Sequence, residues 1–89
     1  MGLDKQKDPE KKDIEFILNL LSKNKFMEVE NEINKLIINF PNSSILLNIL
    51  GAVFAEQNKF EKAIKNYEKA IKINPNYAEA HNNLGVALD

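Results

Sequence analysis

The sequence repeats itself with a period of about 34 residues, and this period constrains the fold more than any other feature. The tripeptide Asn-Lys-Phe at residues 24–26 recurs at 58–60, and Pro-Asn at 41–42 recurs at 75–76. Seven of the twenty positions in the stretch that holds both matches are identical, and the alignment needs no gap. A chain with this period is built from copies of one small unit, and each copy buries its apolar surface against its neighbours.

The spacing of apolar residues within each unit is helical. In residues 60–73 the apolar side chains recur every three or four positions and form one stripe: Phe60, Ala63, Ile64, Tyr67, Ala70 and Ile71. Residues 44–56 are apolar on nearly every side, which predicts a helix covered by neighbours on several faces. Pro41 and Pro75 end the preceding helices. The pattern predicts five helices, at about 9–22, 26–40, 44–57, 60–73 and 77–88.

Capping residues predict where these helices begin. Asparagine followed three positions later by glutamate resembles a capping box, and the sequence holds two such pairs, Asn58 with Glu61 and Asn76 with Glu79. Asp8 before Pro9 predicts an N-cap with a first-turn proline. Two serines just before residue 45, Ser43 and Ser44, are read as caps and not as nucleophiles.

A helix-turn-helix unit of this period resembles the tetratricopeptide repeat. In the unit that starts at Ser44, the family's signature positions hold typical residues except for the first, where leucine replaces a large aromatic: Leu47, Leu50, Gly51, Phe54, Ala63, Tyr67, Ala70 and Pro75. The unit before it resembles the family less, because Ile17 stands where the family has a small glycine. The resemblance implies an all-α fold, a right-handed helical-repeat solenoid of antiparallel helix pairs.

This resemblance divides the chain into a flexible charged tail over residues 1–8 and a repeat domain over 9–89. The domain contains two full units and the first helix of a third, at 10–43, 44–77 and 78–89. Two readings of that last helix remain open. In one, it closes the domain or belongs to a longer array. In the other, a second molecule covers its outer residues His81, Gly85 and Leu88, which predicts a homo-oligomer.

Composition argues against several classes of function. Twelve basic and thirteen acidic residues leave a net charge of -1, so no basic face for nucleic acid is expected. The chain has no cysteine and one histidine, which argues against a metal site or cofactor, and no pair at reactive spacing predicts an enzyme. No apolar run approaches the roughly 20 residues that cross a bilayer, so membrane insertion is not expected. A cytoplasmic protein fits these features best.

The resemblance instead implies a scaffold that binds a protein or peptide partner. In this family the first helix of each unit lines a concave groove that receives a segment of the partner. The positions carried over to this sequence are Ile14, Leu18, Leu21, Asn48, Ala52, Ala55, Glu56, Asn82, Asn83 and Val86. Asn48 and Asn82 are separated by one repeat period and are expected to form a ladder of amides that pairs with peptide backbone. The alternative is that these asparagines only reflect an asparagine-rich composition.

Overall fold

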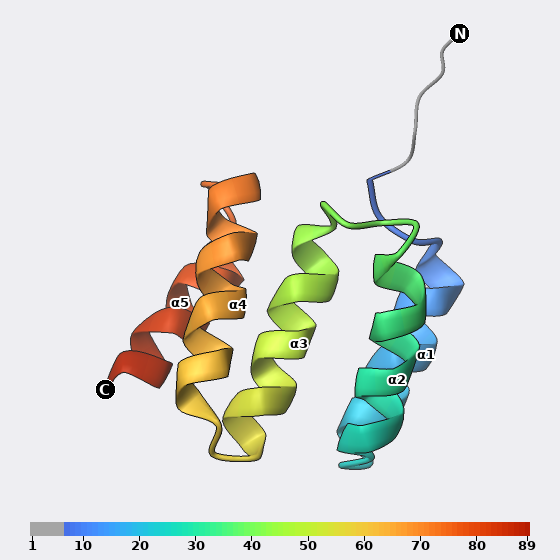
Figure 1. Cartoon of the computed structure of the whole chain (residues 1–89), viewed down its shortest axis with the longest axis horizontal. Helices are drawn as coiled ribbons and strands as arrows, with labels where there is room; N and C mark the ends of the chain where they lie inside the picture. Colours follow the sequence, from blue (N-terminus) through green and yellow to red (C-terminus); the bar gives the residue numbers. More distant parts are fainter. Residues whose placement is uncertain (1–6) are drawn as a thin grey trace, which may run out of the picture.

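Five α-helices follow one another along residues 7–89, the part of the chain that the computed structural model describes (Figure 1). They are α1 (Lys11–Ser22), α2 (Phe26–Ile37), α3 (Ser44–Glu56), α4 (Phe60–Ile73) and α5 (Ala78–Leu88). No strand occurs within that range. The prediction of an all-α fold is therefore confirmed. Most of the tail predicted over residues 1–8 lies outside the described residues.

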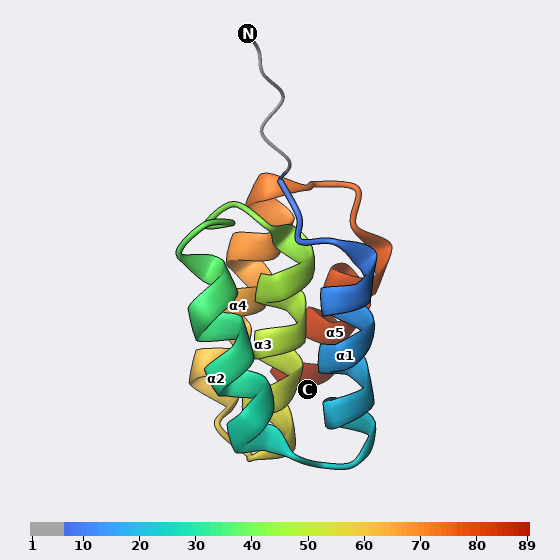
Figure 2. The ribbon, with the colours of Figure 1, turned by 90° about the vertical axis from the view of Figure 1, so that its right-hand side faces the viewer.

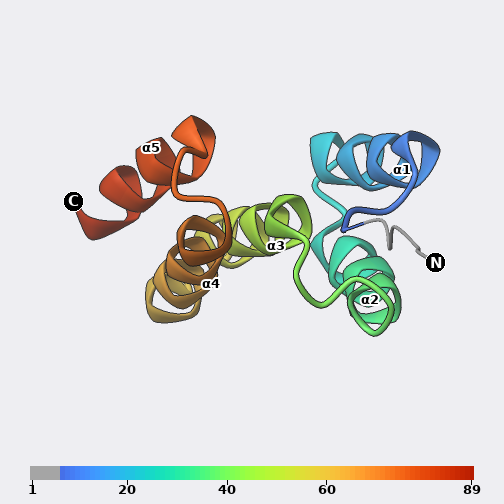
Figure 3. The same ribbon diagram turned by 90° about the horizontal axis from the view of Figure 1, so that it is seen from above.

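Consecutive helices run antiparallel and pack side by side (Figures 1 and 2). Seen from above, α1 and α5 lie on one side, α2 and α4 lie on the other, and α3 lies between them (Figure 3). The helices α1, α3 and α5 thus form an arc whose open side lies between α1 and α5. Contacts between α3 and α4 are far more extensive than those between α1 and α2. In that first pair, Ile17 of α1 stands where the family has glycine, and its side chain is fully buried.

Helix α3 forms the centre of the core, as its all-round apolar pattern predicts. It contributes Leu46, Ile49 and Val53 to a cluster with α1 and α2. Its remaining buried apolar residues, Leu47 and Phe54, pack in two smaller clusters with α4 and α5. Because every cluster contains a residue of α3, burial against this one helix joins all five helices.

Two predicted helix ends are wrong by a few residues. Helix α2 ends at Ile37 and not near residue 40, because the backbone amides of Asn39 and Phe40 both donate to the carbonyl oxygen of Leu36, at 3.1 and 2.9 Å. This turn closes the helix before Pro41 is reached. Helix α1 begins at Lys11, and its N-cap is Glu10, so Asp8 does not have the capping role that the sequence predicts.

The asparagine-led capping boxes are also wrong. Asn58 has φ 62°, in the left-handed region, and the amide of Lys59 donates to the carbonyl oxygen of Phe54 at 2.8 Å. This is the Schellman arrangement that ends a helix, so Asn58 terminates α3 and does not cap α4. Asn24, one period earlier, ends α1 in the same way with φ 59°. The N-cap of α5 is Tyr77 and not Asn76.

Ser43 caps α3 as predicted. Its Oγ accepts a hydrogen bond from the amide of Leu46 at 3.2 Å, and it is fully buried. The same hydroxyl donates to Oδ1 of Asp8 at 2.5 Å. One serine therefore satisfies the first turn of α3 and holds the segment that leads into α1, while Ser44 is the first residue of the helix.

Candidate protein-binding face

Helices α1, α3 and α5 carry all the residues that the sequence assigns to a groove, and they form the arc seen in Figure 3. Leu18 of α1 and Val86 of α5 are 45% and 69% exposed. Glu56 and Asn82 are exposed as well. The half-buried members of the set are Ile14, Leu21, Ala52, Ala55 and Asn83. Among the predicted groove residues, α1 and α5 thus carry one large exposed apolar side chain each, and α3 between them carries small residues.

Asn48 differs from the rest of the predicted groove, because it is only 4% exposed. Its Oδ1 accepts a hydrogen bond from Nδ2 of Asn83 at 3.1 Å, and its own Nδ2 donates to Oη of Tyr77 at 3.4 Å. The amide is therefore engaged at both ends within the protein. The structure pairs Asn48 with Asn83 and Tyr77, and Asn82 takes no part in this network.

Sequence reasoning missed Tyr77 as a member of this face. A signal was present, because Tyr77 lies one repeat period after Ser43 and each is the N-cap of its helix. At the first position a small hydroxyl caps the helix, and at the second a long side chain carries its hydroxyl to Asn48. The partner of a tyrosine hydroxyl depends on which helix packs beside it, and spacing alone does not reveal this.

Helices α3 and α5 of the arc are acidic, whereas α1 carries two lysines and two acidic residues. Neither α3 nor α5 contains a lysine or arginine, whereas Glu56 and Glu79 are both exposed. Burial raises the pKa of Tyr67, and the carboxylates of Glu56 and Glu79 raise it further. Burial also raises the pKa of Tyr77, and Glu79 again adds to the effect. Negative potential therefore acts around α3 and α5, while the lysines of the second repeat lie on α4 and in the turn before it.

The outer face of α5, defined by His81, Gly85 and Leu88, is exposed, and Leu88 is 64% exposed. A β-carbon added at Gly85 would meet no atom within 4 Å. The Nε2 atom of His81 donates a hydrogen bond to the carbonyl oxygen of Pro75 at 2.8 Å. The imidazole is thus held against the loop before α5.

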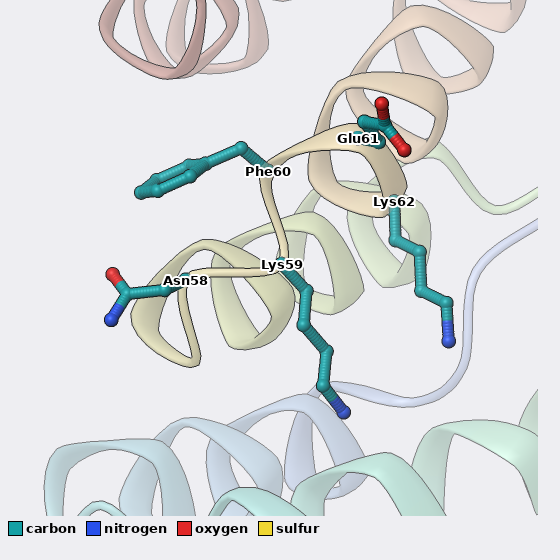
Figure 4. Close-up of a pocket in the computed structure, with 5 residues that line it drawn as sticks. All are labelled: Asn58, Lys59, Phe60, Glu61 and Lys62. Carbon is teal, nitrogen blue, oxygen red and sulfur yellow. The ribbon is translucent and has the colours of Figure 1, made fainter.

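Two hollows lie away from the arc. One, of about 430 Å³, surrounds the turn between α3 and α4 and is lined by Asn58, Lys59, Phe60, Glu61 and Lys62. In Figure 4 the ring of Phe60 extends away from the two lysine side chains, so these groups do not converge on a ligand. The other, of about 470 Å³, lies between α1 and α2 and is lined by Phe16, Leu20, Glu28, Asn31, Glu32 and Lys35.

The described part of the chain offers neither a metal site nor a membrane span. Residues 7–89 hold no group of three or more histidine, aspartate or glutamate side chains placed to bind a metal ion. None of the five helices in that range combines the length and the hydropathy that a membrane span requires.

The contact between Gly51 and Tyr67 matches the signature of the family that the sequence resembles. The ring of Tyr67 lies so close to Gly51 that a β-carbon there would be 2.5 Å from Cε1. A family model described as a TPR repeat matches residues 51–88, from the middle of α3 to the end of α5. Residues 51–88 form a tetratricopeptide repeat segment. This match covers all of α4 and α5.

Curated relatives are similar to about half of this chain. The peroxisomal targeting signal receptor of Candida albicans is 43% identical over 47 residues, which are 53% of this chain and 8% of the receptor. The Saccharomyces cerevisiae receptor of the same name is 38% identical over the same length. A chloroplastic tetratricopeptide repeat domain-containing protein of Arabidopsis thaliana is 40% identical over 42 residues, or 47% of this chain and 14% of that protein. The match thus spans less than a sixth of each relative's length.

Proposed function

We propose that this tetratricopeptide protein is an interaction module that binds a segment of a partner protein along the arc of α1, α3 and α5. The observation that carries the proposal is the pair of exposed apolar side chains, Leu18 and Val86, on the two helices that flank α3. Isolated exposed apolar residues are common on protein surfaces. Here they belong to helices on opposite sides of one arc, and α3 between those helices carries the small residues Ala52 and Ala55.

The chemistry of the arc defines the partner segment. Leu18 and Val86 favour apolar side chains, and the carboxylates of Glu56 and Glu79 favour a lysine or arginine beside them. Asn82 is exposed and offers an amide to peptide backbone, whereas Asn48 is buried and supports the face from within. Two of the relatives are named as targeting signal receptors. Their names support the proposal that this chain also binds a segment of another protein.

A display library of peptides of about twelve residues, selected against the intact protein, tests this proposal. We expect the selected peptides to be apolar and basic, and to lose at least about tenfold in affinity for the Leu18→Glu and Val86→Glu variants. The matched control is Met27→Glu, which makes the same kind of change at a side chain that is 73% exposed on α2, away from the arc. Peptides that bind all three variants equally well would show that the arc is not the binding face.

A second candidate function is self-association through the outer face of α5, favoured by the 64% exposure of Leu88. This role predicts a solution mass that rises with protein concentration, and light scattering behind size exclusion measures it. The Leu88→Glu variant is expected to restore the monomer in that case. A mass that stays near 10.2 kDa across the concentration range would exclude this second role.

A further inference from the structure

One side of α2 lacks the charges that the same side of α4 carries. On α4 this side is a row of exposed residues with alternating charge, namely Glu61, Lys65, Glu68 and Lys72. The residues one repeat period earlier form the outer side of α2, and they are exposed but uncharged: Met27, Asn31, Asn34 and Ile38. Ile38 directly follows the last residue of α2 and keeps helical backbone angles, with φ -61° and ψ -41°. Met27 and Ile38 are 73% and 78% exposed.

The exposure of this outer side does not depend on where the sequence begins or ends. A further unit follows α2 and leaves its outer side exposed, and a whole unit precedes α4 and leaves the equivalent side exposed. The helices that pack against each are in place, α1 and α3 for α2, and α3 and α5 for α4 (Figure 3). Single exposed apolar side chains are common on proteins, but here the whole row of charges that α4 carries is absent.

The outer side of α2 has the same pattern in both directions along the helix. An apolar residue stands at each end and an asparagine at each inner position, with spacings of four, three and four residues. In a two-fold dimer, each contact between two different residues occurs twice, so the surface must be complementary to itself. A second α2 that runs antiparallel would place its Ile38 against Met27 and its Asn34 against Asn31. The pattern therefore fits a second copy of the same helix.

The charges beside the outer side of α2 are also complementary to themselves. Glu28 and Lys35 are exposed and lie on the same flank of the helix, because they are seven residues, or about two turns, apart. In the antiparallel arrangement Glu28 of each copy lies opposite Lys35 of the other, which gives two equivalent ion pairs. Within one chain Lys35 pairs with Glu32 at 3.3 Å, and an exposed pair of this kind is exchanged at little cost.

We propose that α2 binds α2 of a second copy in an antiparallel two-fold contact through Met27, Asn31, Asn34 and Ile38. A contact between two single helices is smaller than the roughly 1,200–2,000 Å² of a stable interface, so the dissociation constant is on the order of 100 µM. Helix α2 lies on the side of α3 away from α1 and α5 (Figure 3). The contact therefore leaves the arcs of both copies free.

Sedimentation equilibrium of the intact protein between about 10 µM and about 1 mM tests this proposal. We expect the mean mass to rise from 10.2 kDa toward twice that value. Met27→Glu and Ile38→Glu should each weaken association at least about tenfold, because each buries a carboxylate in the contact without a partner. The matched control is Lys65→Gln, which makes the same change in net charge on the equivalent side of α4 and should leave association unchanged.

Charge reversal tests the antiparallel arrangement itself. Glu28→Lys places two lysines opposite each other across the contact, and Lys35→Glu places two glutamates there, so each variant alone should weaken association about threefold or more at low salt. The double variant restores opposite charges and should recover most of the affinity. All of these side chains are exposed, so the unfolding midpoint measured at low protein concentration should stay nearly unchanged in every variant.

Three results would overturn the proposal. The first is a mass that stays near 10.2 kDa at the highest concentration. The second is association that persists in Met27→Glu and Ile38→Glu but is lost in Leu88→Glu, which would place the contact on α5. The third is a charge-reversed double variant that associates no better than either single variant. Failure of the arc to bind selected peptides would leave this test unaffected, because it measures the mass of the protein alone.

Discussion

Two asparagines from different repeats, Asn48 and Asn83, join α3 to α5 through a hydrogen bond between their amides. Asn48 is buried, and Tyr77 accepts a hydrogen bond from the other end of its amide. Buried polar groups are stable only when they have partners, and here each partner comes from α5 or the residue that caps it. This small network links α3 to α5 and to the residue that caps it.

Replacing Asn48 with alanine leaves the Asn83 amide and the Tyr77 hydroxyl without this partner. We expect the free energy of unfolding to fall by about 1–3 kcal/mol, measured by urea denaturation. Asn82→Ala is the matched control, because this side chain is exposed on α5, and its effect should stay within about 0.5 kcal/mol. Equal losses in the two variants would show that the Asn48 network does not stabilise the fold.

At the scale of elements, asparagine makes possible the turn after α1 and the turn after α3. Asn24 and Asn58 have φ values of 59° and 62°, and each ends the first helix of its unit. In both turns the backbone amide of the residue after the asparagine reaches back to the helix, from Lys25 to Leu20 and from Lys59 to Phe54. The left-handed conformation excludes most side chains, so the turns depend on asparagine or glycine.

Substitutions at Asn58 test this dependence. Asn58→Gly should leave the free energy of unfolding nearly unchanged, while Asn58→Val should lower it by about 1–2 kcal/mol because a β-branched residue resists positive φ. Asn74→Val is the control, since Asn74 is exposed with φ -129°, where valine is well accommodated. Urea denaturation of the three variants measures the difference. A small effect of Asn58→Val would mean that the turn adopts another conformation.

At the scale of the whole molecule, two tyrosines make the stability of the fold depend on pH. Tyr67 packs between α3 and α4, and Tyr77 lies between α3 and α5. Burial raises the pKa of both phenols, and nearby carboxylates, Glu79 among them, raise each one further. Ionisation of either tyrosine would place a charge at a helix interface that is built around α3.

We expect the free energy of unfolding to fall as the pH rises above about 10. The folded protein holds the phenolic protons more tightly, so the unfolded chain, whose tyrosines have an ordinary pKa of about 10, releases them first. The stabilisation is therefore complete below that pH and is lost as the pH rises through the folded pKa. Urea denaturation near pH 8 and near pH 11 measures the fall. The fall should be smaller in the Tyr67→Phe, Tyr77→Phe double variant, and an equal fall would exclude the tyrosines as its cause.

The amino-acid sequence alone determined the repeat, the five helices and the central place of α3. Apolar periodicity and proline positions determine helices and their ends through local interactions. They can therefore be interpreted without knowing which helices pack together. Gly51, Ala63 and Ala70 hold signature positions of the repeat, and in the structure all three are buried where Tyr67 packs against α3. The groove residues remain predictions, because their exposure is known and their binding is not tested.

Only the tertiary structure decided the roles of Asn48, Asn58 and Gly85. Asparagine suits a helix start, a helix end, an exposed surface and a buried network, and the choice depends on the backbone and the neighbours that surround it. Gly51 and Gly85 occupy the same position of successive repeats, yet the first is covered by Tyr67 and the second is open. Whether a residue is buried depends on which segments pack against it. When those segments are distant in the sequence, only the tertiary fold brings them there.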